Sequence, residues 1–170
     1  MIQQEPHSET GADLRIDVYV RARPADRTQC DAVVETLRTC HESGRIADLN
    51  VDCWPKDVSL ANELLEDPAV AIVDEFERWA AENGVSLEPA FDVRSVHSSI
   101  TDEEDRVLSL PSICIACYNG DELVAVFPCS NDDRTITVPD AIEALVSGDI
   151  DTLIGPFGVS VGAAGDVRSR

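Results

Sequence analysis

Apolar residues first alternate, then recur at helical spacing, then alternate again along the first third of the chain. Residues 14–22 (LRIDVYVRA) alternate as a half-buried strand does. The segment 28–44 has one apolar stripe and predicts a helix with Thr28 as N-cap and Gly44 as C-cap. Residues 45–55 alternate as a second strand. This order predicts a βαβ unit, with two parallel strands joined by a right-handed crossover.

The middle and the end of the chain predict two further helices. One is expected between the N-cap Asp67 and a stop at Gly84, and the last over residues 137–148. Residues 90–98 alternate weakly and predict an edge strand or an extended loop, and residues 99–106 predict an exposed acidic loop. The mixture of strands and helices favours an α/β fold.

The remaining segments carry no such pattern. Residues 56–68 predict a connection with a short helical turn. We expect a disordered tail over residues 1–12, a single domain over 13–150 and a flexible C-terminal tail over 151–170.

Residues 107–127 predict a β-hairpin that turns at Asn119-Gly120, the strongest short hairpin signal. A two-residue turn there would set Cys117 opposite Glu122 and Ile115 opposite Val124. Both faces of this hairpin are apolar, so we expect helices to cover the sheet on both sides.

The hairpin contains a Cys-x-x-Cys sequence, Cys114 to Cys117. Residues three apart on a strand point to opposite faces, so this pair is not expected to share a metal ion or form a disulfide. A redox Cys-x-x-Cys also needs a helix N-terminus to stabilise its thiolate. We therefore interpret both cysteines as structural.

The charge is strongly negative. The chain has 33 Asp and Glu against 13 Lys and Arg, a net charge of −20, and Lys56 is its single lysine. Such a composition is typical of the cytosol of halophilic archaea, where dense carboxylates hold water and cations and salt screens their repulsion. The alternative is a protein that binds cations or basic partners. We expect a cytoplasmic protein, because no apolar segment is long enough to span a membrane and no signal peptide is evident.

Six cysteines are present, and in a reduced cytosol buried thiols are the default. Cys30 stands out because it falls in the first turn of a predicted helix, where a thiol pKa is lowered. It also belongs to the apolar stripe of that helix, and burial is the interpretation we favour. His41 and His97 have no cysteine partner at metal-site spacing, so no metal and no cofactor is expected.

The segments YVRARP…TQC and LSLPSICIACYNGDELVAVF, with the order of elements around them, resemble the thioredoxin and glutaredoxin family over residues 14–148. The resemblance implies a three-layer thioredoxin-like sandwich with a mixed central sheet, a C-terminal β-hairpin and a final helix. It also implies a cis-proline at Pro111 lying against a catalytic cysteine, for which Cys30 is the nearest match. The family's Cys-x-x-Cys is replaced here by PADRTQC, so a dithiol mechanism is not expected.

Three further segments are VVETLRTCHESGRIADLNVDCWP, WAAENGVSLEPAFDVRSVHSS and the hairpin LPSICIACYNGDELVAVFPCS. Through them nearly the whole chain is also similar to a small haloarchaeal family whose members carry the label helix-turn-helix domain protein. The label implies a transcription regulator. The residues after Gly44 alternate as a strand, and the preceding helix carries Glu35 and Glu42, so the sequence predicts neither a recognition helix nor a basic face.

Three functions follow from these observations. The favoured one is a non-catalytic thioredoxin-like module that binds a protein or a small molecule and serves a regulatory role. The second is a monothiol oxidoreductase that uses Cys30 opposite Pro111. The third is a transcription regulator. A nucleic acid partner is not expected from the charge but follows from the family label, and no membrane partner is expected.

Overall fold

A four-stranded mixed sheet forms the centre of the molecule. The computed structural model describes residues 13–24, 26–60, 67–132 and 134–149. The sheet has the strand order β2-β1-β6-β7. Its strands are β1 (Leu14–Arg21), β2 (Asp48–Trp54), β6 (Ile113–Asn119) and β7 (Glu122–Phe127). Strands β1 and β2 are parallel, and the other two pairs are antiparallel. The predicted α/β class and the mixed sheet are confirmed.

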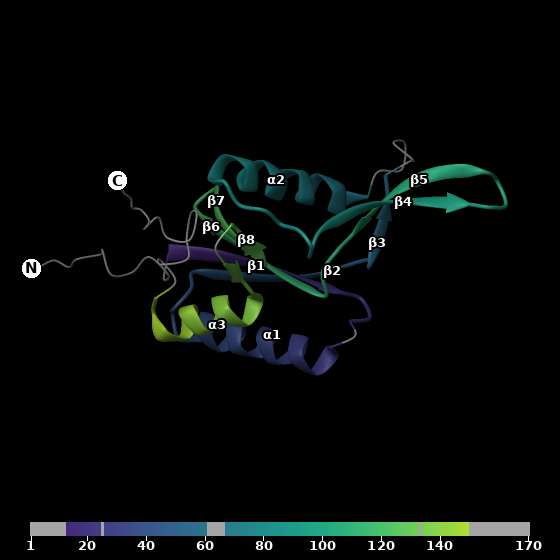
Figure 1. Ribbon diagram of the computed structural model, residues 1–170. Helices are drawn as coiled ribbons and strands as arrows, with labels where there is room; N and C mark the ends of the chain where they lie inside the picture. The colour runs from purple at the N-terminus through teal and green to yellow at the C-terminus, as the bar shows by residue number, and fades with distance from the viewer. Residues whose placement is uncertain (1–12, 25, 61–66, 133, 150–170) are drawn as a thin grey trace, which may run out of the picture.

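Three helices pack against this sheet. Figure 1 shows α1 (Arg27–Glu42) and α3 (Val138–Ser147) on one side of it and α2 (Pro68–Asn83) on the other. The apolar stripe predicted for α1 is buried at Cys30, Val33, Leu37 and Cys40. The two apolar faces of the hairpin are therefore covered by helices, as the sequence predicted.

Local capping sets the ends of α2 and α3. The Asp67 side chain accepts a hydrogen bond from the backbone N–H of Ala69 at 2.8 Å, and α2 ends at Gly84 with φ +69°. Thr137 and Asp140 form a reciprocal capping box at the start of α3, which ends at Gly148. These boundaries match the prediction.

The start of α1 differs from the prediction. The helix begins at Arg27 and its N-cap is Asp26, whose side chain makes no capping hydrogen bond. Thr28 therefore lies inside the helix, and its expected role as N-cap is wrong. The C-cap is Ser43, and Gly44 follows it with φ +82°.

A second, three-stranded sheet was not predicted. It has the order β3-β5-β4, with β3 (Asp57–Ser59), β4 (Asp92–Ser98) and β5 (Glu103–Ser109). Figure 1 shows β4 and β5 as a long ribbon that extends away from the helices. The edge strand expected over 90–98 is confirmed as β4. The acidic loop expected over 99–106 is wrong for Glu103–Arg106, which pair with β4.

The hairpin forms with a shifted register. Asn119 pairs with Glu122 across the turn, and a bulge between Cys117 and Tyr118 displaces the remaining pairs. Ile115 therefore lies opposite Phe127 rather than Val124, and Cys117 opposite Ala125 rather than Glu122. The extra residue of a bulge reverses the faces of the residues beyond it, which a two-residue turn alone does not reveal.

The core occupies both sides of the sheet. Leu14, Ile16 and Val18 of β1 are fully buried on one face. On the other face Tyr19 stacks on Trp54, with ring centroids 4.9 Å apart, and meets Phe76 of α2 edge-on. Phe91 contacts both Trp54 and Phe76 edge-on, so this aromatic cluster joins the main sheet to the segment before β4.

The small remaining elements complete the description. Strands β8 (Cys129–Ser130) and β9 (Thr135–Ile136) form a two-stranded sheet. Within the described ranges, none of the helices is both long and apolar enough to cross a membrane. The two predicted tails, and most of the helical turn expected within 56–68, lie outside the described residues.

Candidate functional site around Cys30 and Pro111

The two residues singled out by the sequence, Cys30 and Pro111, lie near each other. Cys30 is in the first turn of α1, where its N–H donates to the carbonyl of Asp26 at 2.9 Å. Pro111 lies in the short segment Leu110–Ser112 between β5 and β6. The Cys30 sulfur points at the carbonyl oxygen of Ser112, 3.9 Å away. The structure thus brings the cysteine to the residue next to the proline.

Hydrogen bonds hold each carbonyl of this segment. The Arg21 side chain donates to the Leu110 carbonyl through Nε at 2.8 Å and also through Nη2. The indole Nε1 of Trp54 donates to the Pro111 carbonyl at 3.2 Å. The backbone N–H of Arg21 donates to the Ser112 carbonyl at 2.9 Å. These hydrogen bonds satisfy the three carbonyls and tie the segment to the ends of β1 and β2.

The chemistry of Cys30 follows from its surroundings. The residue is only 3% exposed. Burial raises the pKa of its thiol, the carboxylates of Asp26 and Asp31 raise it further, and Arg21 opposes them. A raised pKa keeps the sulfur protonated at neutral pH, and the thiol is a far weaker nucleophile than the thiolate. The position at the helix N-terminus does not lower the thiol pKa here, because burial, and after it the two nearby carboxylates, raise it.

The Leu110–Pro111 peptide bond does not have the isomer implied by the thioredoxin resemblance. The cis peptide bonds of the described residues are Glu88–Pro89 and Phe127–Pro128, so Leu110–Pro111 is trans. The expectation of a cis-proline at Pro111 is therefore wrong.

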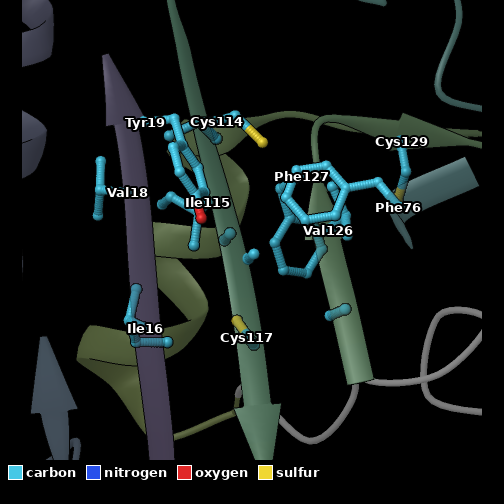
Figure 2. Close-up of a cluster of buried hydrophobic side chains, with 14 of the residues drawn as sticks. Ile16, Val18, Tyr19, Phe76, Cys114, Ile115, Cys117, Val126, Phe127 and Cys129 are labelled. Atoms are coloured by element: carbon cyan, nitrogen blue, oxygen red, sulfur yellow. The ribbon is translucent and has the colours of Figure 1, made fainter. Parts of the chain in front are cut away.

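The Cys114-x-x-Cys117 pair is divided by the sheet. Cys114 pairs with Tyr19 and Cys117 with Ile16, which point to opposite faces of β1. Figure 2 shows the two cysteines at separate positions along β6. Both side chains are fully buried, and burial raises the pKa of Cys117 to about 12 and that of Cys114 well above its usual value. Both thiols are free, as the alternation predicted.

The other cysteines divide into buried and exposed. Cys40 and Cys129 are buried, and burial raises the pKa of Cys129 to about 12. Cys53, in the edge strand β2, is exposed, so the expected packing is wrong for this residue. Across the part of the chain that the structure describes, no three His, Cys, Asp or Glu side chains are grouped as metal ligands would be.

Two residues of the site were missed by the sequence reasoning. Arg21 and Trp54 lie at the ends of the parallel strands β1 and β2, and they pair with each other in the register. Their positions at one edge of the sheet follow from the predicted βαβ unit. That both would bind the Leu110–Ser112 segment depends on the antiparallel pairing of β6 with β1, which no local pattern encodes.

A polar cluster near the other end of β1 was also missed. The Arg15 guanidinium lies over the Tyr118 ring at 4.2 Å and pairs with Asp17 at 3.3 Å. The Tyr118 hydroxyl donates to Glu75 of α2 at 3.1 Å. This cluster links α2 to β1 and β6 and places charges on the sheet face that α2 covers.

Comparison with known proteins gives one assignment. A family described as helix-turn-helix domain matches residues 8–149. No match was found among curated proteins or among solved structures. Strands separate each consecutive pair of the described helices, so no two of these helices follow each other directly in the sequence as the family's name would suggest. Because the match covers most of the sequence, this chain belongs to the helix-turn-helix domain family.

Proposed function

We propose that this protein is a non-catalytic regulator of transcription that acts through contact with other proteins. Membership of the helix-turn-helix domain family supports the link to transcription. The absence of a basic face on the three described helices supports protein contact in place of direct DNA binding, and it is the observation that carries the proposal.

The charges on the helices are specific. On α1, Arg27 and Arg38 are offset by Asp31 and Glu35, which lie 3.8 and 3.7 Å from them. α2 carries a single arginine and several carboxylates, and α3 carries carboxylates and no basic residue. A helix that enters a DNA groove needs Lys or Arg near phosphates, because neutralised phosphates supply most of the affinity. None of the three described helices meets that requirement.

The proposed fold is a three-layer thioredoxin-like sandwich that serves as a binding scaffold. Support comes from the strand order β2-β1-β6-β7, from the parallel first pair and antiparallel hairpin, and from helices on both faces. The trans Leu110–Pro111 bond and the single cysteine of the first turn differ from the redox members of that family. The protonated, buried thiol of Cys30 supports a scaffold that does no thiol chemistry.

The monothiol oxidoreductase remains the second proposal, with Cys30 and Pro111 as its site. The observation in its favour is that the Cys30 sulfur lies 3.9 Å from the carbonyl of Ser112, beside Pro111. An oxidoreductase of this kind would require Cys30 to become exposed and deprotonated on binding its substrate.

Two measurements test the main proposal together. Deleting the gene in the organism that encodes it should change the transcript levels of a defined set of genes. Purified protein should not retard duplex DNA that spans those promoters, from 0.1 M to multimolar potassium chloride. Retardation specific to those promoters would overturn protein-mediated action. Unchanged transcripts would overturn the link to transcription.

A further inference from the structure

A groove between α2 and the edge strand β7 has the form of a peptide-binding site. Its volume is about 400 Å³, and the residues lining it come from the last turns of α2 and the start of β7. Trp79 is buried to 5% exposure, while Leu123 and Val124 are half-buried. These three side chains form the apolar part of the groove.

Strand β7 has a free edge beside this groove. It is the last strand in the order β2-β1-β6-β7, and among the described residues its strand partner is β6 alone. The bulge leaves Val124 without an opposing residue on β6. An outer strand edge presents N–H and C=O groups that an extended peptide can pair with, and an adjacent helix can form the other wall of the site.

The charge of the groove indicates the charge of the segment that it binds. Glu82 of α2 and Glu122 of β7 are exposed at its walls, and Glu75, a further lining residue of α2, is half-buried. Arg78 is the one basic residue of the lining. Carboxylates at both walls favour a peptide that carries Arg or Lys, since complementary charge steers association and rejects acidic partners.

We propose that this groove binds an extended basic segment of a partner protein, which adds to β7 as a fifth strand of the main sheet. Side chains of a strand alternate between faces, so a segment that alternates apolar with basic residues fits. One set of its side chains faces α2 and contacts Trp79 and Leu123, and the basic set lies on the sheet face of Glu122, which alternates with Leu123 along β7. The inference rests on the proposed function, because it gives the chemistry of the protein through which the regulator acts.

The test uses defined peptides as probes. A fluorescein-labelled peptide of alternating Arg and Val, six residues long, is titrated with the full-length protein and followed by anisotropy. Two controls are a peptide of alternating Glu and Val, and a peptide with three Arg followed by three Val. Binding of the alternating basic peptide should shift the NMR signals of the amides of Glu122, Leu123 and Val124.

Matched variants separate the groove from the general negative charge. The double variant Glu82→Lys/Glu122→Lys should weaken binding of the alternating basic peptide at least tenfold. Glu42→Lys/Glu143→Lys makes the same change in net charge on α1 and α3, across the sheet, and should leave the affinity within about twofold. Equal losses in both variants would overturn the groove and leave a non-specific charge effect.

Three other outcomes would also overturn parts of the proposal. If the peptide with three Arg followed by three Val binds as tightly as the alternating basic peptide, strand addition is overturned. Shifts of the same amides with protein concentration alone would overturn a peptide partner and assign the edge to a second copy of the chain. No binding of any peptide would overturn the groove while leaving the transcript and DNA measurements, and hence the proposed function, intact.

Discussion

The guanidinium of Arg21, at the end of β1, donates to the carbonyl of Leu110 at 2.8 Å, across 89 positions of the chain. This bond ties the end of the first strand to the segment that enters β6. Arg21 also donates through its backbone to the Ser112 carbonyl, so one residue holds two of the three carbonyls there. The arrangement makes Arg21 the main structural anchor of the Cys30–Pro111 region.

Replacing the Arg21 side chain should destabilise the fold. Arg21→Met keeps much of the side-chain length but leaves the buried Leu110 carbonyl without its charged donor. We expect the free energy of unfolding to fall by about 1.5–3 kcal/mol, as is usual for hydrogen bonds to charged groups. Urea denaturation measures this. Arg38→Met, which removes an exposed ion pair with Glu35, should cost less than about 0.5 kcal/mol. Similar losses in the two variants would contradict the anchoring role.

The thiols should react in an order set by exposure. Under native conditions a maleimide should label Cys53 rapidly, because its side chain is exposed, and should label Cys30 only after unfolding. Peptide mass mapping at several times of reaction measures both rates on one sample. Labelling of Cys30 as fast as that of Cys53 would favour the oxidoreductase over the scaffold.

The caps of two helices give a direct comparison. Asp67→Ala removes the acceptor for the Ala69 N–H at the start of α2 and should lower the free energy of unfolding by about 1 kcal/mol. Thr28 lies inside the first turn of α1 and is not its N-cap. Thr28→Ala should therefore change the free energy of unfolding by less than about 0.5 kcal/mol. Thermal or urea denaturation of both variants distinguishes these outcomes. A loss of stability in Thr28→Ala as large as that in Asp67→Ala would support Thr28 as the N-cap, as expected from the sequence.

Alkaline pH should destabilise the fold through its buried thiols. The folded-state pKa of Cys117 is raised to about 12, whereas the unfolded chain loses that proton near 9.0. Below the unfolded pKa the stabilisation is fully present. Between the two values the unfolded state binds fewer protons than the folded state, so stability falls as pH rises.

The expected loss is about 1.4 kcal/mol per pH unit for each such thiol. Urea denaturation between pH 7 and pH 10.5 measures the slope. The variant Cys117→Ala should flatten the slope by one thiol's share. An unchanged slope in Cys117→Ala would contradict this assignment.

Salt should stabilise the protein. The chain has a net charge of −20, and its carboxylates repel one another most strongly in the compact folded state. On this ground we propose that the protein is adapted to a saline cytosol. Screening shortens from about 10 Å at 0.1 M to about 3 Å at 1 M salt, so the melting temperature should rise most steeply over that interval. Calorimetry in potassium chloride measures this. A flat or falling melting temperature over that interval would contradict the proposal.

Periodicity and capping predicted the first βαβ unit, α2 and α3, because each of these depends on residues close in sequence. Asp67 and Gly84 show this clearly, since both act within one turn of their own helix. The outer half of β5 was missed because Glu103–Arg106 are charged and exposed, and a strand segment with no buried face has no alternation to detect. The bulge in the hairpin was missed because it is settled by packing and not by the turn residues.

The candidate site was predicted in part. The proximity of Cys30 to the segment around Pro111 followed from the resemblance, and the burial of Cys30 followed from its place in an apolar stripe. The roles of Arg21 and Trp54 required the long-range pairing of β6 with β1. The groove beside β7 required two elements that are far apart in the sequence, and composition predicted only its negative charge.

The ribbon formed by β4 and β5 joins the rest of the molecule at its base, where Leu108 is buried, while Ile100 near its tip is 93% exposed. Its outer half contributes almost nothing to the interior. The tip between positions 98 and 103 should therefore accept changes in length and sequence at little cost in stability.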